Sequence, residues 1–426
     1  MRRDGGAFWN YWGASTLSST GTAVTAVALP LTAVTVLDAT PFQLGMVAAA
    51  SYLAWALIGL PAGVITQRLP LRRTQIACDL VRALAIASVP LVWWLGYLSI
   101  GQLVATALVI NFAEVLFFAA SSTFMVSVVP KDELNARNSL MSGTHAVTQL
   151  GGPSLGGLLV QLMGAVPALF VDAVSYVASA VLLRRLPERN PVDSGEARTS
   201  MRVMIADGWR FVAHHPVMAP ATWWACVVNF VCGAQMALFA VYLVRNLEAP
   251  PGVVGLLLAT EGVGALIFAS LTPWLVRRFG SARVLLAEGV LGAVAATIIP
   301  WGHGSTGWIF FAVGNCLFAG SVVPGSVVTR TYRQLASPPE LLSRVMATVR
   351  FVSWGSIPAG GLAAGALAEV VGVRTTLLLA APLMLLGPVL VWASPIRNLR
   401  NLEDYGTEPA PATAASASAG PEDTRV

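Results

Sequence analysis

Two glutamates, Glu114 and Glu261, lie near the middle of long runs of apolar residues. An Asp at the centre of a membrane helix costs about 2.5–3.5 kcal/mol on insertion scales, so a buried acid there needs a partner or a function. Removal from water favours the protonated carboxyl group, which suits a group that carries protons between two sides of a membrane. An ionised glutamate could instead attract a cation, or be held permanently by Asn or Arg neighbours. We predict Glu114 and Glu261 as proton-coupling candidates.

Four further charged or titratable side chains stand in or near apolar runs. Asp79 and Arg82 are spaced i,i+3, which brings their side chains within reach of one another on a helix. We interpret them as a structural ion pair at a cytoplasmic gate. Arg350 would enter the membrane from the cytoplasm, where a gate contact is favoured over substrate binding. His145 could carry protons, but a packed polar residue near the start of a helix is the favoured interpretation.

The motifs of soluble and membrane-bound enzymes are missing from the sequence. Neither H-E-x-x-H nor G-x-S-x-G occurs, and a phosphate-binding loop would need G-x-x-x-x-G-K-[ST], whereas Lys131 follows Pro130. The four cysteines form no C-x-x-C pair and are interpreted as small packing residues. We therefore expect no enzyme, no ATP-driven pump, no cofactor and no metal. The cysteines are Cys78, Cys226, Cys232 and Cys316.

The composition is that of a chain surrounded by lipid. Hydrophobic residues make up 56% of the 426 residues and charged residues 11%, whereas soluble domains carry about 25% charged residues. Many apolar runs reach the roughly 20 residues that cross a bilayer as a helix. A β-barrel would show alternating segments of about 10 residues instead. The sequence predicts an all-α integral membrane protein.

We expect twelve transmembrane helices in two bundles of six. The polar segment 185–218 separates the first bundle, residues 1–184, from the second, residues 219–402. Residues 198–215 are interpreted as an amphipathic helix docked at the base of the bundle. The tail, residues 403–426, is expected to be disordered. The expected spans are 8–36, 42–65, 74–95, 102–122, 139–161, 166–184, 219–243, 252–275, 283–300, 307–328, 348–368 and 375–394.

The basic residues predict the orientation. If the N-terminus is cytoplasmic, 22 of the 26 Lys and Arg residues fall in inner segments, and the outer loops hold only Arg245 and Arg374. This asymmetry predicts that both termini face the cytoplasm of a plasma or inner membrane. The first apolar run is too long for a cleavable signal peptide.

The chain contains an internal duplication. E-L-x-x-R occurs at Glu133–Arg137 and again at Glu340–Arg344, and both following spans contain a Pro followed by paired glycines. Two halves in parallel orientation predict a binding site near the midplane between them. In the first half, Gly152-Pro153 is followed by Gly156-Gly157. The proline bends a helix and the glycines let a neighbouring helix approach closely.

Five short motifs in register with the twelve spans, together with the basic segment between the second and third spans, resemble the major facilitator superfamily. Within it, the chain is similar to the drug:proton antiporter branch of macrolide-efflux and enterobactin-exporter types, from about Phe8 to Ser394. The resemblance implies a central cavity, proton antiport and, through the glycine–proline pattern, export. The residues that carry it are Leu60-Pro61-Ala62-Gly63, Arg68, Arg72, Arg73, Asp79-Leu80-Val81-Arg82-Ala83, Ala113-Glu114-Val115-Leu116-Phe117, Gly152-Pro153-x-x-Gly156-Gly157 and Arg344-Val345-Met346-Ala347-Thr348-Val349-Arg350-Phe351.

The resemblance also assigns positions around the cavity. It places Glu114 and Glu261 on cavity helices, whereas Asp172 and Glu288 fall on outer helices and are interpreted as structural. Three acids expected from the family are replaced by Thr22, Gln67 and Phe118, which calls the usual proton coupling into question. An apolar pocket with a few polar groups suits an amphipathic organic molecule. The cavity candidates are Tyr52, Trp55, Asn111, Asn229, Phe230, Gln235, Asn315 and Trp354.

The sequence thus predicts a secondary transporter that exports a small amphipathic molecule, such as a drug, an antibiotic or a siderophore-like compound, by proton antiport. The alternative is an uncoupled, lipid-translocating or importing transporter of the same fold, since a fold does not fix substrate or direction. The expected partners are a small-molecule substrate, protons and the lipid bilayer. We expect no nucleic acid partner and a monomeric protein.

Overall fold

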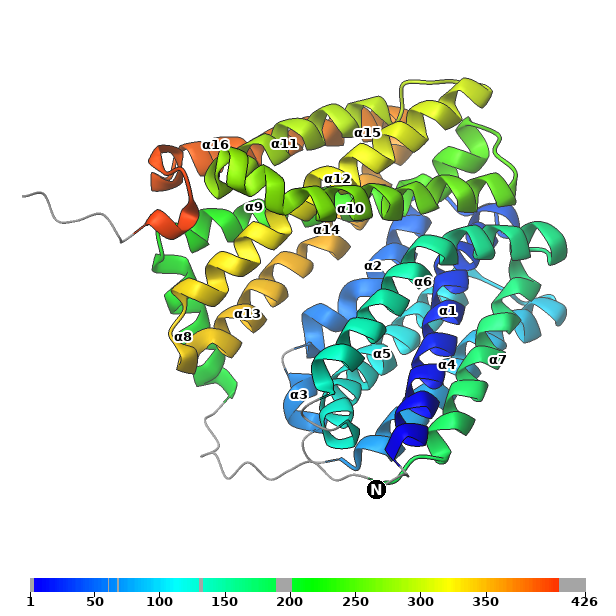
Figure 1. Ribbon diagram of the computed structural model, residues 1–426. Coiled ribbons are helices and arrows are strands. Elements are labelled where there is room, and N and C mark those ends of the chain that lie inside the picture. The colour runs from blue at the N-terminus through cyan, green and yellow to red at the C-terminus, as the bar shows by residue number, and fades with distance from the viewer. Residues whose placement is uncertain (1–3, 60, 67–68, 130–132, 189–200, 406–426) are drawn as a thin grey trace, which may run out of the picture.

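Helices make up almost all of the structure. In the computed structural model these helices are joined by short turns, and the described part of the chain contains no β-strand. Gln67, Arg68 and most of the predicted tail lie outside the described residues. The structure describes residues 4–59, 61–66, 69–129, 133–188 and 201–405 (Figure 1).

The first half of the molecule contains helices α1 to α7. Local sequence explains how α2 begins, because Thr40 and Gln43 form a capping box and Pro41 occupies a position that needs no N–H donor. The Thr40 hydroxyl accepts a hydrogen bond from the Gln43 N–H (3.3 Å), and the Gln43 side chain accepts one from the Thr40 N–H (2.9 Å). The bounds are α1 Asp4–Thr35, α2 Pro41–Ile58, α3 Pro61–Thr66, α4 Leu71–Trp94, α5 Ile100–Val128, α6 Leu134–Met163 and α7 Ala165–Arg184.

The second half contains helices α9 to α16 and follows the linker helix α8 Met201–His214. In α8, Gly208 packs against α13, and Asp207 pairs with Arg344 of α13 at 3.0 Å. The bounds are α9 Met218–Val241, a π-helical turn Tyr242–Asn246, α10 Pro251–Phe279, α11 Ser281–Ile298, α12 Gly304–Ala336, α13 Pro339–Trp354, α14 Ser356–Val371, α15 Val373–Ala380, a 3-10 turn Ala381–Leu385, α16 Leu386–Trp392, and 3-10 turns Pro395–Asn398 and Leu402–Asp404.

The predicted all-α membrane fold is confirmed. Eleven helical segments in the described residues are long and apolar enough to cross a membrane. The remaining predicted span corresponds to α6, a 30-residue helix whose first turns are polar and which packs between α1 and α10. Residues 402–404 form an ordered turn, in which Glu403 accepts a hydrogen bond from Ser281 (3.1 Å). The first residues of the predicted tail are therefore ordered, contrary to the prediction.

Three predicted continuous spans are interrupted in the structure. Span 42–65 breaks between α2 and α3, span 348–368 breaks at Gly355, and span 375–394 passes through the 3-10 turn Ala381–Leu385. Each break comes just before a proline or at one: Pro61, Pro358 and Pro382. Proline lacks an N–H donor and its ring clashes with the carbonyl group four residues earlier, which favours a break, although Pro30, Pro90 and Pro153 lie inside helices that continue past them.

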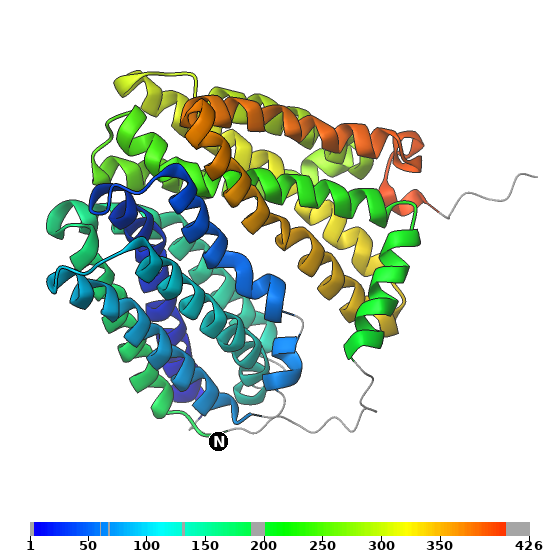
Figure 2. The same ribbon diagram turned by 180° about the vertical axis from the view of Figure 1, so that it is seen from behind.

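The two halves meet at one end of the molecule and separate toward the other, as both views show (Figures 1 and 2). Helix α2 packs against α14, and α6 packs against α10. We call the end that carries residues 36–40 and 247–250 the closed end, and the end that carries α3 and α8 the open end. At the closed end Asp38 and Arg245 form an ion pair between the halves at 2.6 Å.

Glycines allow the close helix contacts at the closed end. A Cβ atom added to Gly45 of α2 would lie 2.5 Å from the Gly361 carbonyl oxygen of α14. A Cβ atom added to Gly157 of α6 would lie 2.7 Å from the Cα atom of Gly255 in α10. Any side chain at these positions would force the two halves apart, so the sequence must keep glycine where the halves touch.

Candidate functional site

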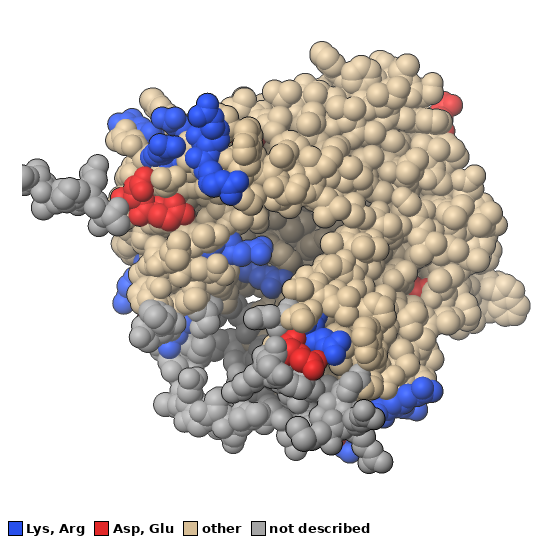
Figure 3. All heavy atoms as spheres, viewed as in Figure 1, with Lys and Arg blue, Asp and Glu red and all other residues tan. Residues whose placement is uncertain are grey.

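A cavity of about 840 Å³ lies between the two halves and opens at the open end. Figure 3 looks into this hollow, and basic side chains border it. Its walls come from α2, α3 and α5 in the first half and from α9, α11, α12 and α13 in the second. Sites for drug-sized molecules typically measure about 300–1,000 Å³. The cavity is therefore large enough for such a molecule.

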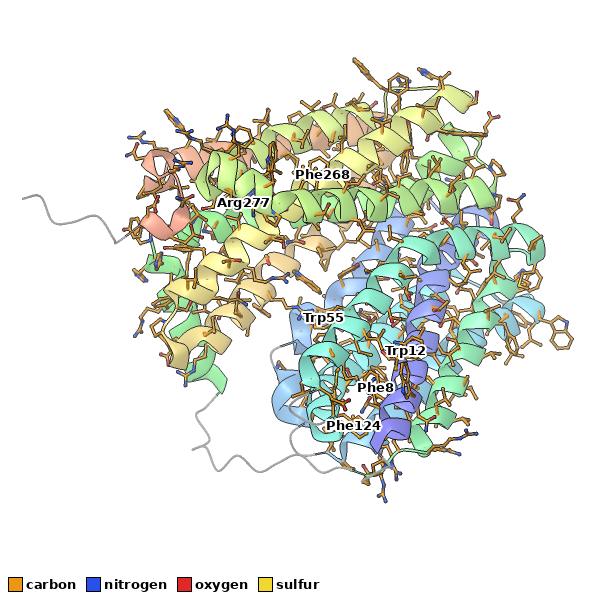
Figure 4. The ribbon with its side chains drawn as sticks, in the orientation of Figure 1. Phe8, Trp12, Trp55, Phe124, Phe268 and Arg277 are labelled. Carbon is orange, nitrogen blue, oxygen red and sulfur yellow. The ribbon has the colours of Figure 1, made fainter. Side chains whose placement is uncertain are left out.

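Aromatic rings from both halves form one wall of the cavity. Trp55 of α2 lies 5.5 Å from the ring of Phe118 of α5 and 5.3 Å from the ring of Trp354 of α13, measured between ring centroids. Tyr52 stands one helical turn before Trp55, with its ring 6.4 Å from that of Trp354. Trp55 points from α2 into the space between the halves (Figure 4). We call Trp55, Phe118 and Trp354 the aromatic wall.

Arg350 lies against the aromatic wall. Its guanidinium carbon is 4.1 Å from the ring centroid of Trp55, 4.2 Å from that of Trp354 and 5.4 Å from that of Phe118. A guanidinium over an aromatic face is held by the negative potential of the ring. The contacts with Trp55 and Phe118 cross from the second half to the first, so this arginine links the halves inside the cavity.

Glu288 of α11 also reaches the cavity, although the sequence placed it on an outer supporting helix. The residue is only 5% exposed, and its carboxyl group lies near the Trp224 side chain. Its Oε2 atom has no hydrogen-bond partner among the described residues. A Cβ atom added to Gly325 of α12 would lie 1.4 Å from Oε2. Gly325 therefore leaves the gap through which this carboxyl group meets the cavity.

The sequence offered only an indirect signal for Glu288. An acid stands in an apolar run, and the neighbouring helix in the structure carries the helix-disrupting pair Pro324-Gly325. Without knowing that α11 packs against α12 with Gly325 facing Glu288, these two features could not be connected. Contact between the helices is what gives the acid access to the cavity.

Glu114 and Glu261 lie beside the cavity and are not among its described lining residues. Both are close enough to Tyr52 to interact with it electrostatically. Glu114 is partly buried on α5, near Arg82 and His145. Glu261 is on an exposed side of α10, near Cys232, which lines the cavity. The two acids thus flank the space between the halves from opposite sides.

The core of the first half contains a buried polar network. The predicted ion pair between Asp79 and Arg82 is present, and both side chains are almost completely buried. Asp79 accepts a hydrogen bond from Ser179 (2.7 Å), and the Arg82 guanidinium carbon lies 4.5 Å from the ring centroids of Phe117 and Tyr176. These contacts join α4, α5 and α7 within the first half and do not bridge the two halves.

Asp172 extends this polar network toward α1. Its carboxyl group accepts hydrogen bonds from Thr25 and from Ser175 (3.1 Å). Tyr176 and Thr22 form a further hydrogen bond between α7 and α1 (2.9 Å). Thr22, which replaces an acid expected from the family, thus tightens the packing of α1 on α7.

The other predicted cavity residues divide into two groups. Asn229 lines the cavity, and its amide donates to the Ala225 carbonyl oxygen at 2.8 Å. Asn315 is instead bound between α12 and α10, where it donates to Thr260 (3.1 Å). Asn111 and Gln235 are buried, and Phe230 packs its backbone against Gly360 of α14. The structure thus brings Trp55, Asn229, Trp354 and Arg350 together in the cavity wall, with Tyr52 beside them.

The glycine–proline motif of α6 packs against two helices. A Cβ atom at Gly152 would lie 2.3 Å from that of Ala23, and one at Gly156 would lie 3.2 Å from the Cα atom of Val24, both in α1. Gly157 faces α10 in the other half, and Pro153 lies within α6. The motif therefore lets one helix contact both its own half and the opposite one.

Two arginines of the basic segment between the second and third predicted spans pair within the first half. Arg72 and Arg73 lie 3.0 and 3.5 Å from the carboxylate of Glu188, which follows α7. Arg72 also donates to the carbonyl oxygen of Leu186 (2.5 Å). These bonds fasten the start of α4 to the end of α7.

Curated relatives and solved structures agree with this architecture. The chain is 26% identical over 402 residues to the multidrug efflux pump Tap of Mycolicibacterium fortuitum, covering 91% of this chain and 95% of that protein. It is 26% identical over 290 residues to the uncharacterized MFS-type transporter y4rN of Sinorhizobium fredii, covering 67% and 70%. The fold matches a crystal structure of a point mutant of the nucleoside transporter NupG with a TM-score of 0.79 at 12% identity, covering 91% and 99%.

A family model fits nearly the whole chain. The model for transmembrane secretion effectors matches residues 4–421. Twelve helices in two halves around a central cavity are the architecture of major facilitator transporters. The chain therefore belongs to the transmembrane secretion effector family of the major facilitator superfamily, and it is a multi-pass membrane transporter.

Proposed function

We propose that this transporter exports small amphipathic molecules by alternating access, driven by proton antiport. The observation that carries the proposal is the cavity between the halves, which combines the aromatic wall with Arg350, Asn229 and Glu288 and is visible as a hollow toward the open end (Figure 3). An apolar pocket with a few placed polar groups suits an amphipathic organic molecule. The similarity to a multidrug efflux pump supports the export direction.

The proposed orientation places the open end in the cytoplasm. Basic residues concentrate there: Arg72 and Arg73 lie in the first turn of α4, Arg210 lies on α8, and Arg344 lies on α13. The outer loops predicted from the sequence carry Arg245 and Arg374. The positive-inside rule then gives a cytoplasmic open end, from which the cavity would load its substrate. The closed end would open outward after the halves rock about the cavity.

The proton path in this proposal uses three acids. Glu114 and Glu261 flank the cavity, and Glu288 enters it beside Gly325. Carboxyl groups within a membrane protein mark proton relays when they face a cavity. Each would release its proton to the cytoplasm in the inward-open state and rebind one from outside after the halves rock.

Proteoliposome transport tests the function directly. With a proton gradient imposed, we expect the purified transporter to move amphipathic drugs and siderophores uphill and to move protons in the opposite direction. Glu114→Gln and Glu261→Gln should each lower this coupled flux about tenfold or more while substrate binding is retained, since the proton carrier is lost. Transport that persists unchanged in both variants and needs no pH gradient would contradict antiport and favour an uncoupled or lipid-translocating transporter.

The glycine contact at the closed end gives a second prediction. Gly157→Leu places a side chain against Gly255 and the Pro251 carbonyl oxygen, which a Cβ atom would approach to 2.6 Å. We expect the closed end to separate, and transport to fall about tenfold or more, because the inward-open state loses its main contact between α6 and α10. Val254, beside Gly255 on α10, is fully buried, so reaction of Val254→Cys with a membrane-impermeant maleimide should become faster in the same background.

The matched control is Gly151→Leu. Gly151 is on the same helix, and nothing lies within 4 Å of a Cβ atom added there. This control should leave both transport and labelling unchanged. Equal labelling rates for the wild type and Gly157→Leu would show that the glycine contact does not hold the closed end together.

A further inference from the structure

Three arginines line the cavity wall formed by the second half: Arg330, Arg333 and Arg350. Arg330 is close enough to each of the other two to repel it electrostatically. Among the residues that the structure describes, none of the three has a carboxylate oxygen within 4.0 Å. Glu288 is the one acid in the described lining. Positive charge therefore dominates the cavity.

These guanidinium groups keep unused hydrogen-bond donors. Arg333 is 8% exposed, and the Nε atoms of Arg333 and Arg350 have no hydrogen-bond partner among the described residues. A guanidinium carries five N–H donors in a planar fork that matches carboxylate, sulfonate and phosphate oxygens. A buried charge without a counter-charge is destabilising, so a group that supplies the missing negative charge would bind strongly.

We propose that the arginine cluster binds the anionic group of the substrate, so that this transporter carries anionic amphipathic molecules with an aromatic or apolar body. The inference rests on the proposed transport function and names its substrate class. The aromatic wall meets Arg350, so a ring and an acid group of one molecule could be bound side by side. Such a ligand would touch Trp55 and Phe118 of the first half and the arginines of the second.

Membrane topology alone does not account for this cluster. Arginines at cytoplasmic helix ends fix orientation whichever way they point. Arg277 and Arg278 at the end of α10 are of that kind, because they are exposed and are not among the described cavity-lining residues (Figure 4 labels Arg277). Arg333 and Arg350 instead line the cavity. For fixing the orientation in the membrane, a charge inside the cavity has no advantage over an exposed one.

Two probes of opposite charge and matched ring test the inference. Naphthalene-2-sulfonate and trimethyl(2-naphthyl)ammonium are measured by equilibrium dialysis against the purified transporter in nanodiscs, with empty nanodiscs as the blank. We expect the wild type to bind the sulfonate about tenfold or more tightly than the ammonium ion, with affinity that falls as salt rises. Arg350→Gln and Arg333→Gln should each lower sulfonate affinity about tenfold and leave ammonium affinity unchanged or higher.

Controls separate charge recognition from damage to the fold. Arg277→Gln removes the same charge outside the cavity and should change neither affinity. Arg350→Lys keeps the charge and should bind the sulfonate more tightly than Arg350→Gln but less tightly than the wild type, since lysine lacks the planar fork. Affinities are compared only for variants that elute from a size-exclusion column as a single symmetric peak, as the wild type does.

The outcomes distinguish this inference from the proposed function. Equal affinity for both probes, a preference for the ammonium ion, or an equal loss in Arg277→Gln and Arg350→Gln would overturn anion recognition. If the ammonium ion is nevertheless driven uphill in proteoliposomes, the export proposal stands although anion recognition fails. If the sulfonate binds through the arginines but neither probe is transported under a proton gradient, anion recognition stands and the export proposal fails.

Discussion

Glu288→Gln is expected to abolish uphill transport while leaving substrate exchange intact. Glu288 is 5% exposed, and its carboxyl group has one oxygen without a partner among the described residues and meets the cavity beside Gly325. Glutamine has nearly the same shape but cannot take up or release a proton. Coupled accumulation in proteoliposomes should fall about a hundredfold, a typical cost of losing a positioned proton-transfer group. Exchange of labelled for unlabelled substrate needs no net proton movement and should persist.

A second variant tests the gap itself. Gly325→Ala places a methyl group where the Glu288 carboxylate lies, so it should impair coupling without changing any titratable group. The control is Glu369→Gln, the same replacement at an exposed position near the end of α14. If Glu288→Gln accumulates substrate as the wild type does, Glu288 is a structural residue and the proton path runs through Glu114 or Glu261.

Asp79→Asn is expected to be the most destabilising single charge removal in the first half. Arg82 is 3% exposed and would keep its charge after losing the carboxylate of Asp79. Removing one partner of a buried ion pair costs about 3–5 kcal/mol, because the other charge is left uncompensated. Asp79 also accepts a hydrogen bond from Ser179, so the contact between α4 and α7 weakens as well. Thermal unfolding in detergent, followed by tryptophan fluorescence, measures the loss.

The double variant Asp79→Asn/Arg82→Gln separates charge from packing. It should recover part of the lost stability, because no uncompensated charge remains buried. An exposed pair provides the comparison: Glu133 and Arg137 lie 2.8 Å apart at the start of α6, and Glu133→Gln should cost less than about 1 kcal/mol. If Asp79→Asn and Glu133→Gln lost the same amount of stability, water would have to reach Arg82, and the polar network would not be shielded from solvent.

One of the three residues that replace acids expected from the family, Phe118, lines the cavity. Phe118 stands where the resemblance leads one to expect an Asp, and it packs on Trp55 with its ring 5.4 Å from the guanidinium of Arg350. Arg350 thus meets aromatic rings where a carboxylate could have paired with it. This exchange agrees with a cavity that keeps its positive charge for a ligand.

The sequence by itself determined the membrane class, the spans, the duplication and the family. Each of these depends on local composition, because a helix in lipid must satisfy its own backbone and needs about 20 apolar residues to cross. The glycine–proline motif also identified close contacts from sequence, since only glycine leaves room for another backbone. Asp79 and Arg82 were recognised as a pair because their spacing on one helix is local information.

Only the tertiary structure decided which side of each helix faces the cavity. Glu288 was assigned to an outer helix and reaches the cavity, whereas Asn315 was assigned to the cavity and is bound between α10 and α12. In a membrane helix that is apolar on all sides, the sequence pattern gives no preferred inner face. The rotation of each helix is set by packing against its neighbours, here by glycines such as Gly325, whose missing side chain leaves room for the Glu288 carboxyl group.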